Sequence, residues 1–179
     1  MPAAAPTPAR GQHDFERLYA AELDYVWNSV RRLGVAPAHL EDVTQEVFVT
    51  AWKRMDTYDS ARPLRPWLFG IAFRVASDFK ARAWQRHEVS DDEADGTDTS
   101  ASPVEHLERR QAQALVLQAL EQIPLERRGI FVMHDIDGTP IPEVAERLEI
   151  PLNTAYSRLR LARRDFAGAI TSLKEDSAA

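Results

Sequence analysis

Apolar residues recur at helical spacing along most of the chain, and no segment shows the apolar and polar alternation of a half-buried strand. A proline, Pro124, separates two of the periodic stretches, because proline is excluded from a helix interior. The expected helices cover residues 13–33, 38–55, 64–86, 104–122 and 125–134, with a further helical pair in residues 139–164. This pattern predicts an all-α protein.

The helix expected at 38–55 has two different faces. The apolar face carries Val43, Val47, Ala51, Trp52 and Met55, and the other face carries Asp42, Gln45, Glu46, Val49 and Lys53. Such an amphipathic helix buries one side and leaves the other free for solvent or for a partner.

The helix expected at 64–86 carries two apolar stripes. One consists of Trp67, Ile71, Val75 and Phe79, and the second, at a different angle, of Phe69, Phe73, Lys80 and Trp84. Either both stripes are core, or the second is exposed. Exposed aromatic rings beside Arg65, Arg74, Lys80, Arg82 and Arg86 would suit stacking against single-stranded bases, with phosphates held nearby.

Residues 139–164 predict two short helices joined by a tight turn. Pro140 and Pro142 suit a first helical turn, and Pro151 forces the chain to turn before it. Asn153 or Thr154 is expected to cap the second helix, whose inward stripe is Ala155, Leu159 and Ala162.

The outward side of that second helix is basic. Residues 153–164 contain four arginines and no acid. Amides and hydroxyls can read base edges, and arginines bind guanine or phosphate, as a recognition helix requires. The pattern therefore indicates a helix-turn-helix DNA reader; the alternative is a helical hairpin with a solvated basic face. The outward residues are Asn153, Tyr156, Ser157, Arg160, Arg163 and Arg164, with Arg158 at the margin.

The net charge of −6 is unevenly distributed. Residues 1–87 carry +2, residues 88–105 carry −7 and residues 106–179 carry −1. The acidic segment is rich in Gly, Ser and Thr, which predicts a flexible linker. A DNA-mimicking or autoinhibitory role is the alternative, and calcium binding lacks the ligand spacing. Because both halves are nearly neutral beside this linker, we expect the isolated chain to bind DNA weakly.

The chain is expected to form two small domains, at residues 13–87 and 106–170, with a disordered tail at 1–12, the linker at 88–105 and a second tail at 171–179. It has no cysteine, no apolar run of membrane-spanning length, and an N-terminus unlike a signal peptide, so a cytoplasmic location is expected. The histidines His13, His39, His87, His106 and His134 lack ligand spacing, and no catalytic pairing or cofactor motif occurs, so neither an enzyme nor a metal site is expected.

Two segments resemble conserved regions of bacterial sigma factors of the extracytoplasmic-function (ECF) type. The second conserved region resembles LEDVTQEVFVTAWKRMDTYDSARPLRPWLFGIAFRVASDF, and the fourth resembles ALEQIPLERRGIFVMHDIDGTPIPEVAERLEIPLNTAYSRLRLARR. The resemblance covers most of residues 14–168. It rests on the spacing of Asp42, Gln45, Glu46, Phe48 and Trp52, followed by Arg65, Pro66 and Trp67.

The resemblance implies a two-domain helical initiation factor that recruits core RNA polymerase to promoters and helps to melt DNA. The region 2 bundle would occupy residues 13–87, and the region 4 helix-turn-helix residues 106–170. Polymerase contacts would be the clamp coiled coil of the largest subunit and the flap, with the linker near the path of RNA. The implied polymerase-binding residues are Asp42, Gln45, Glu46, Val49 and Lys53. Those for the −10 element are Tyr58, Asp59, Arg62, Arg65, Trp67, Phe73, Arg74 and Lys80, and those for the −35 element are Asn153, Thr154, Tyr156, Ser157, Arg158, Arg160, Arg163 and Arg164.

The chain departs from the family pattern at the turn, where Glu149 replaces the usual glycine and Ala155 a larger aliphatic residue. The resemblance predicts no extra C-terminal regulatory domain, because no long extension follows residue 170. It leaves an anti-sigma factor open as a further partner. The alternative function is a stand-alone helix-turn-helix regulator whose N-terminal half serves dimerisation.

Overall fold

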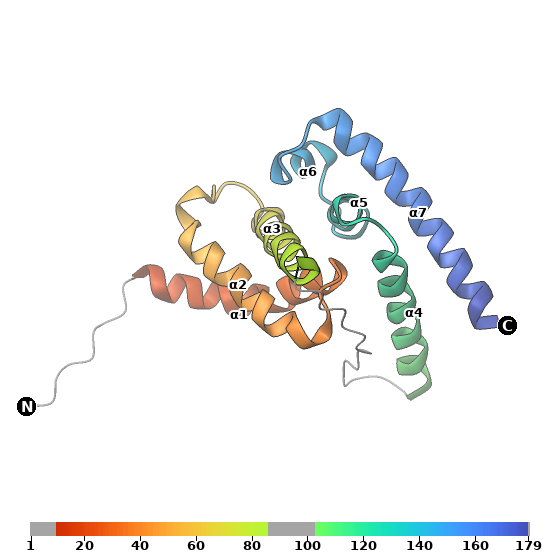
Figure 1. Cartoon of the computed structure of the whole chain (residues 1–179). Coiled ribbons are helices and arrows are strands. Elements are labelled where there is room, and N and C mark those ends of the chain that lie inside the picture. The colour runs from red at the N-terminus through yellow and green to blue at the C-terminus, as the bar shows by residue number, and fades with distance from the viewer. Residues whose placement is uncertain (1–9, 86–102, 179) are drawn as a thin grey trace, which may run out of the picture.

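The computed structural model describes residues 10–85 and 103–178, and every regular element in these two ranges is helical. The elements of the first half are α1 (Arg10–Arg32), η1 (Pro37–His39), α2 (Leu40–Lys53), η2 (Met55–Thr57) and α3 (Leu64–Gln85). Those of the second half are α4 (Pro103–Glu121), α5 (Leu125–Phe131), η3 (Val132–Ile136), α6 (Ile141–Arg147) and α7 (Leu152–Ala178). Figure 1 shows the two groups of helices side by side, with α3 of the first group packed against α6 of the second. The all-α prediction is confirmed.

The first half is a bundle of α1, α2 and α3. Its helices bury the apolar sides that their periodicity predicts, because each helix packs against the other two. Gly34 ends α1 with a φ of 81°, a left-handed conformation that suits glycine after a helix. The buried side chains include Val26, Val30, Leu33, Val43, Val47, Ala51, Leu68 and Phe69.

One residue of α2 lies differently from the prediction. Trp52 was expected in the apolar face, but 47% of it is exposed. It follows Ala51 by about 100° around the helix and shares a row with Gln45 and Val49 instead. Its ring packs edge-to-face with that of Phe15 of α1, with 4.9 Å between the ring centroids.

Both apolar stripes of α3 are largely buried. Phe69 is fully buried and Trp67 is 6% exposed, while Phe73 is half-buried against Gly129 of the second half. Only Trp84, with 83% exposed, remains outside near the end of the helix. The core interpretation therefore holds for most of α3, because α1 and α2 cover one side and α6 covers another.

The second half packs α5 and α4 against α7. A π-helical turn, Val132–Ile136, continues α5 beyond the end expected at residue 134, and the N–H of Asp137 reaches the carbonyl of Val132 at 2.9 Å. Gly138, with a φ of 75°, then ends the turn. The wider π turn brings Asp137 to the first half, where it meets Tyr25.

The helix-turn-helix forms as predicted from Pro140 and Pro142, but two details differ. Asn153 and Thr154 lie inside α7 rather than capping it, since the carbonyl of Pro151 already accepts the N–H of Ala155 at 3.0 Å. Glu149 has a φ of 56°, the only described non-glycine residue with a positive φ. The turn thus adopts the left-handed conformation that glycine supplies in the family pattern.

The expected tails and linker also need adjustment at their ends. Residues 171–178, expected as a tail, continue α7, because Phe166 and Ala169 extend its apolar side against α4 and α5. Residues 10–12 begin α1 and residues 103–105 begin α4. Residues 1–9 and 86–102, with the rest of the expected linker and N-terminal tail, lie outside the described residues.

Candidate polymerase and nucleic-acid surfaces

The polar face of α2 is open. All five side chains expected to bind polymerase, Asp42, Gln45, Glu46, Val49 and Lys53, are exposed on one side of the helix. Val49, 51% exposed, and Trp52 form an apolar centre between charged groups, and Glu46 pairs with Arg82 of α3 at 3.4 Å. The sequence prediction omitted Trp52 from this surface, although its spacing of three residues from Val49 was a usable signal.

The arginines expected at the −10 element lie on α3 and in the loop before it, and each has an acidic partner. Arg62 contacts Glu143 and Glu146 of α6, and Arg74 contacts Glu149 after α6. Arg65 donates through Nε to Glu22 at 2.9 Å and lies 4.9 Å above the ring of Tyr25. These pairings could not be predicted from the sequence, because the partners are up to 84 residues away.

Hydrogen bonds from its own side chains stabilise the loop before α3. The hydroxyl of Tyr58 donates to the carbonyl of Arg62 at 2.9 Å, and the carboxylate of Asp59 accepts the N–H of Ala61 at 2.9 Å. The ring of Tyr58 packs 5.2 Å from that of Trp67. Because Trp67 is almost fully buried, its ring cannot stack on a base in this conformation and instead packs against that of Tyr58.

Lys80 does not join the arginine surface. Its ammonium donates to the carbonyl of Gly34 at 2.5 Å, at the C-terminal end of α1. Burial, followed by the nearby charge of Arg128, lowers the pKa of Lys80 to about 8. The ring of Phe73 is also covered in this structure, since it lies against Gly129 of α5. Lys80 and Phe73, both expected to bind DNA, therefore lie next to Arg128 and Gly129 of the second half.

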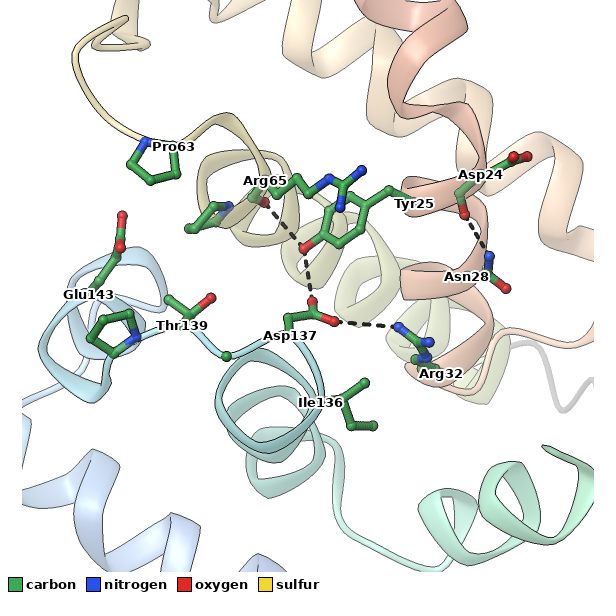
Figure 2. Close-up of a pocket in the computed structure, with 13 residues that line it drawn as sticks. Asp24, Tyr25, Asn28, Arg32, Pro63, Arg65, Ile136, Asp137, Thr139 and Glu143 are labelled. Atoms are coloured by element: carbon green, nitrogen blue, oxygen red, sulfur yellow. Dashed lines mark hydrogen bonds and ion pairs between the residues drawn. The ribbon is translucent and has the colours of Figure 1, made fainter. Parts of the chain in front are cut away.

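A cavity of about 600 Å³ lies between the two halves, as Figure 2 shows. The hydroxyl of Tyr25 donates to Asp137 at 2.9 Å, and Arg32 lies 3.4 Å from the same carboxylate. Burial raises the pKa of Asp137 despite these contacts, and burial followed by the charge of Asp137 raises the pKa of Tyr25. The lining residues come from α1, from the start of α3 with the loop before it, and from the segment between the end of η3 and the first turn of α6.

The outward side of α7 is accessible. Asn153, Tyr156, Ser157, Arg160, Arg163 and Arg164 are exposed, with Thr154 and Arg158 half-buried, and Ala155, Leu159 and Ala162 are buried opposite them. The structure thus brings six of the expected −35 residues to one exposed side of a helix, with Thr154 and Arg158 at the margin of that side. Asp135, from the π turn, pairs with Arg163 at 2.6 Å, and this hydrogen bond lowers the pKa of Asp135.

Neither metal chemistry nor a membrane span is indicated by the residues that the structure describes. No group of three or more His, Cys, Asp or Glu side chains gathers there as a metal ion would need. His39 packs against Phe79 at 5.1 Å, and His134 bonds through Nδ1 to the carbonyl of Thr139 at 2.8 Å, while His87 lies outside the described ranges. Within those ranges, no helix has both the length and the apolar character to cross a bilayer.

Two family profiles match the chain in order. The profile described as Sigma-70 region 2 matches residues 18–86, and the profile described as Sigma-70, region 4 matches residues 113–166. The first span covers most of α1 to α3. The second runs from α4 into α7 and includes the whole helix-turn-helix.

Two curated relatives are similar to this chain over most of its length. The ECF RNA polymerase sigma factor SigL of Mycobacterium tuberculosis is 31% identical over 148 residues, covering 82% of this chain and 83% of the relative. The RNA polymerase sigma factor NccH of Alcaligenes xylosoxydans xylosoxydans is 27% identical over 165 residues, covering 90% and 89%.

Two solved structures share the fold. RpoE of Bartonella quintana, solved with the anti-sigma factor NepR, matches with a TM-score of 0.66 at 18% identity, covering 88% of this chain and 97% of that one. CnrH, solved with the cytosolic domain of CnrY, matches with a TM-score of 0.61 at 22% identity, covering 90% of each. With the two regions in order and SigL as a relative, the chain belongs to the ECF sigma factors of the sigma-70 family, which bind RNA polymerase and direct transcription initiation from promoters.

Proposed function

We propose that the three surfaces divide the work of this sigma factor. The open face of α2 binds the clamp coiled coil of the largest polymerase subunit. It suits that partner because a rigid helix presents an apolar centre, Val49 and Trp52, between charged side chains. The second half contacts the polymerase flap, by analogy with the family.

The outward side of α7 enters the major groove at the −35 element. The observation that carries this assignment is that six exposed polar and basic side chains gather on one side of a helix whose other side is core, with Thr154 and Arg158 at the margin. Arg160 and Asn153 are placed to reach base edges or phosphates, whereas Arg163 must first leave Asp135.

The loop before α3 and the adjoining side of α3 bind the −10 strand and help to open the duplex. Extruding a base costs a few kcal/mol, which stacking and a fitted pocket can offset. Tyr58 and Asp59 shape the loop, and Arg62, Arg65 and Arg74 supply positive charge for phosphates. Trp67 contributes by holding Tyr58.

The two DNA surfaces need polymerase to set their separation. Elements named −10 and −35 are about 25 base pairs apart, or roughly 85 Å of B-DNA at 3.4 Å per base pair. The 27 residues of α7 span only about 40 Å at 1.5 Å per residue. With Arg62 bonded to α6, the helix just before α7, the two DNA surfaces lie on neighbouring elements, so we expect both promoter elements to be reached only when polymerase holds the surfaces apart.

Two features of the proposal come from the family alone. RpoE and CnrH were each solved with a second protein, in one case named an anti-sigma factor, and we extend such a partner to this chain. The site of action would be the cytoplasm, where polymerase works. Sigma factors in general are not enzymes, and we assign this chain no reaction.

A mutational comparison tests the division of labour. Gln45→Ala with Glu46→Ala should abolish co-purification with core polymerase, whereas Arg160→Ala should keep assembly and lose upstream promoter binding. Lys174→Ala is the matched control for Arg160→Ala, because it removes one exposed cation from the same helix outside the DNA face. Promoters are identified by sequencing DNA bound to the assembled polymerase. Tight, specific duplex binding by the free chain without polymerase assembly would favour the stand-alone regulator.

A further inference from the structure

Two exposed apolar side chains stand at the start of the outward side of α7. Leu152 is 43% exposed and Tyr156 is 53% exposed. They are four residues apart, so they are neighbours on the helix surface, with about 5–6 Å between their Cβ atoms. We call these two residues the apolar pair. A single exposed apolar side chain is ordinary, but two adjacent ones beside a basic surface are typical of a contact surface.

The ring of Tyr156 is free, whereas polar groups near it already have partners within the protein. The hydroxyl of Ser157 donates to the carbonyl of Thr154 at 2.9 Å, and Arg163 pairs with Asp135 at 2.6 Å. The side chain of Tyr156 has no hydrogen bond and no ring contact with any described residue. It is therefore available to a molecule outside the chain.

The charges around the apolar pair indicate the class of that molecule. Arg160 follows Tyr156 by four residues and Arg164 follows Arg160 by four, so one row along α7 changes from apolar to basic. Residues 153–164 contain four arginines and no acid. The row fits an anionic partner that presents apolar groups between its charges, and double-stranded DNA is such a partner.

The major groove offers an apolar side chain one kind of methyl group. Base edges there carry hydrogen-bond donors and acceptors, and only thymine adds a methyl group, at C5. A recognition helix brings its N-terminal residues to the base edges, and Leu152 is the first residue of α7. Four residues of helix rise by about 6 Å, close to two base-pair steps of about 3.4 Å each. The apolar pair can therefore reach thymines in neighbouring base pairs.

We propose that the apolar pair selects A·T pairs at one end of the −35 element by covering the 5-methyl groups of thymines on either strand. This inference rests on the proposed function of α7 as the reader of that element. It adds Leu152 to the reader and gives Tyr156 a role that depends on its ring rather than on its hydroxyl. Arg160, about 6 Å further along the helix, then lies over guanine or phosphate roughly two base pairs away.

Removal of the methyl groups tests the inference on the DNA side. The probe is a double-stranded promoter with the −35 element found by sequencing, bound by the full chain assembled with core polymerase. Each thymidine of the element is replaced in turn by deoxyuridine, which keeps every hydrogen-bonding group and lacks only the methyl group. We expect wild-type affinity to fall roughly three- to fivefold per covered methyl, the effect of burying one apolar carbon. Deoxyuridine in the spacer is the matched DNA control and should leave the affinity unchanged.

Protein variants identify the side chain that covers each methyl group. Leu152→Ala and Tyr156→Ala should each bind the thymidine promoter more weakly and lose the preference for thymidine over deoxyuridine at one position. Tyr156→Phe should keep that preference, because the ring remains and only the hydroxyl is lost. Ile136→Ala shortens another exposed apolar side chain of the second half, so it is the matched control and should behave as the wild type.

Several outcomes would overturn the inference. They are equal wild-type affinity for thymidine and deoxyuridine at every position, a −35 element without A·T pairs, and a preference for thymidine that survives in both alanine variants. Loss of co-purification with core polymerase in Leu152→Ala, with the preference unchanged, would assign the apolar pair to a protein contact instead.

The role of α7 itself is judged separately with Arg160→Ala. If this variant weakens upstream promoter binding while deoxyuridine has no effect, α7 remains the −35 reader and only the methyl contact is refuted. If neither Arg160→Ala nor the two alanine variants of the apolar pair weaken upstream binding, the proposed function of α7 fails as well.

Discussion

The stability of the folded chain should rise between pH 8 and pH 10 because of Lys80. Its ammonium is buried beside the guanidinium of Arg128, and its pKa falls from 10.5 to about 8. In the unfolded chain the same group keeps its proton until about pH 10.4. Between these values the unfolded state binds more protons, so the free energy of unfolding increases with pH.

The size of this increase follows from the pKa of Lys80. The full shift would correspond to roughly 3 kcal/mol at 1.36 kcal/mol per pKa unit. The ammonium is only partly buried and keeps a bond to the carbonyl of Gly34, so an effective dielectric near 20 reduces the expected gain to about 1–2 kcal/mol. Tyr25, whose pKa is raised, acts in the opposite direction above about pH 10, which closes the window.

Urea unfolding at several values between pH 8 and pH 10 measures the gain. Lys80→Met should remove most of the slope, while Lys174→Met, which changes an exposed lysine, should retain it. The Lys80 variant also leaves the Gly34 carbonyl without its donor, at a cost of about 1 kcal/mol that shifts the whole curve. Equal slopes in the wild type and in Lys80→Met would show that the buried ammonium does not titrate in this range.

Two further predictions concern single positions. Thr44 of α2 is 2% exposed and its hydroxyl has no partner among the described residues, so Thr44→Val should gain about 1 kcal/mol in thermal unfolding; a loss would mean the hydroxyl is satisfied. Gly34→Ala should lose about 2 kcal/mol or more, since φ is 81° and the new Cβ would lie 2.0 Å from Arg128 Nη1. Its control, Gly168→Ala in α7, meets nothing within 4 Å and should gain up to about 1 kcal/mol; matching effects at both glycines would contradict this reasoning.

Much of the secondary structure depends on local sequence signals and could be predicted from the sequence. Helical periodicity and Pro124, Pro140 and Pro151 placed the helices to within a few residues, except for the end of α7, because both signals act over single turns. The α2 surface was also predicted correctly as an exposed face, since alternation of polar and apolar sides decides which side of a bundle helix is buried. The predicted cap of α7 was wrong, because the helix begins at Leu152 and the carbonyl of Pro151 accepts its first N–H bond.

The sequence by itself determined two helical units, the identity of their exposed helix faces and the family resemblance that the relatives confirm. The tertiary structure alone decided how α3 is used, since its second apolar stripe is covered by helices that lie some 60 residues further along the chain. It also decided that Arg62 and Arg74 meet glutamates of the second half and that Trp67 is buried. The partner of a charged or aromatic side chain cannot be predicted from its place in the sequence, because it depends on how distant helices pack.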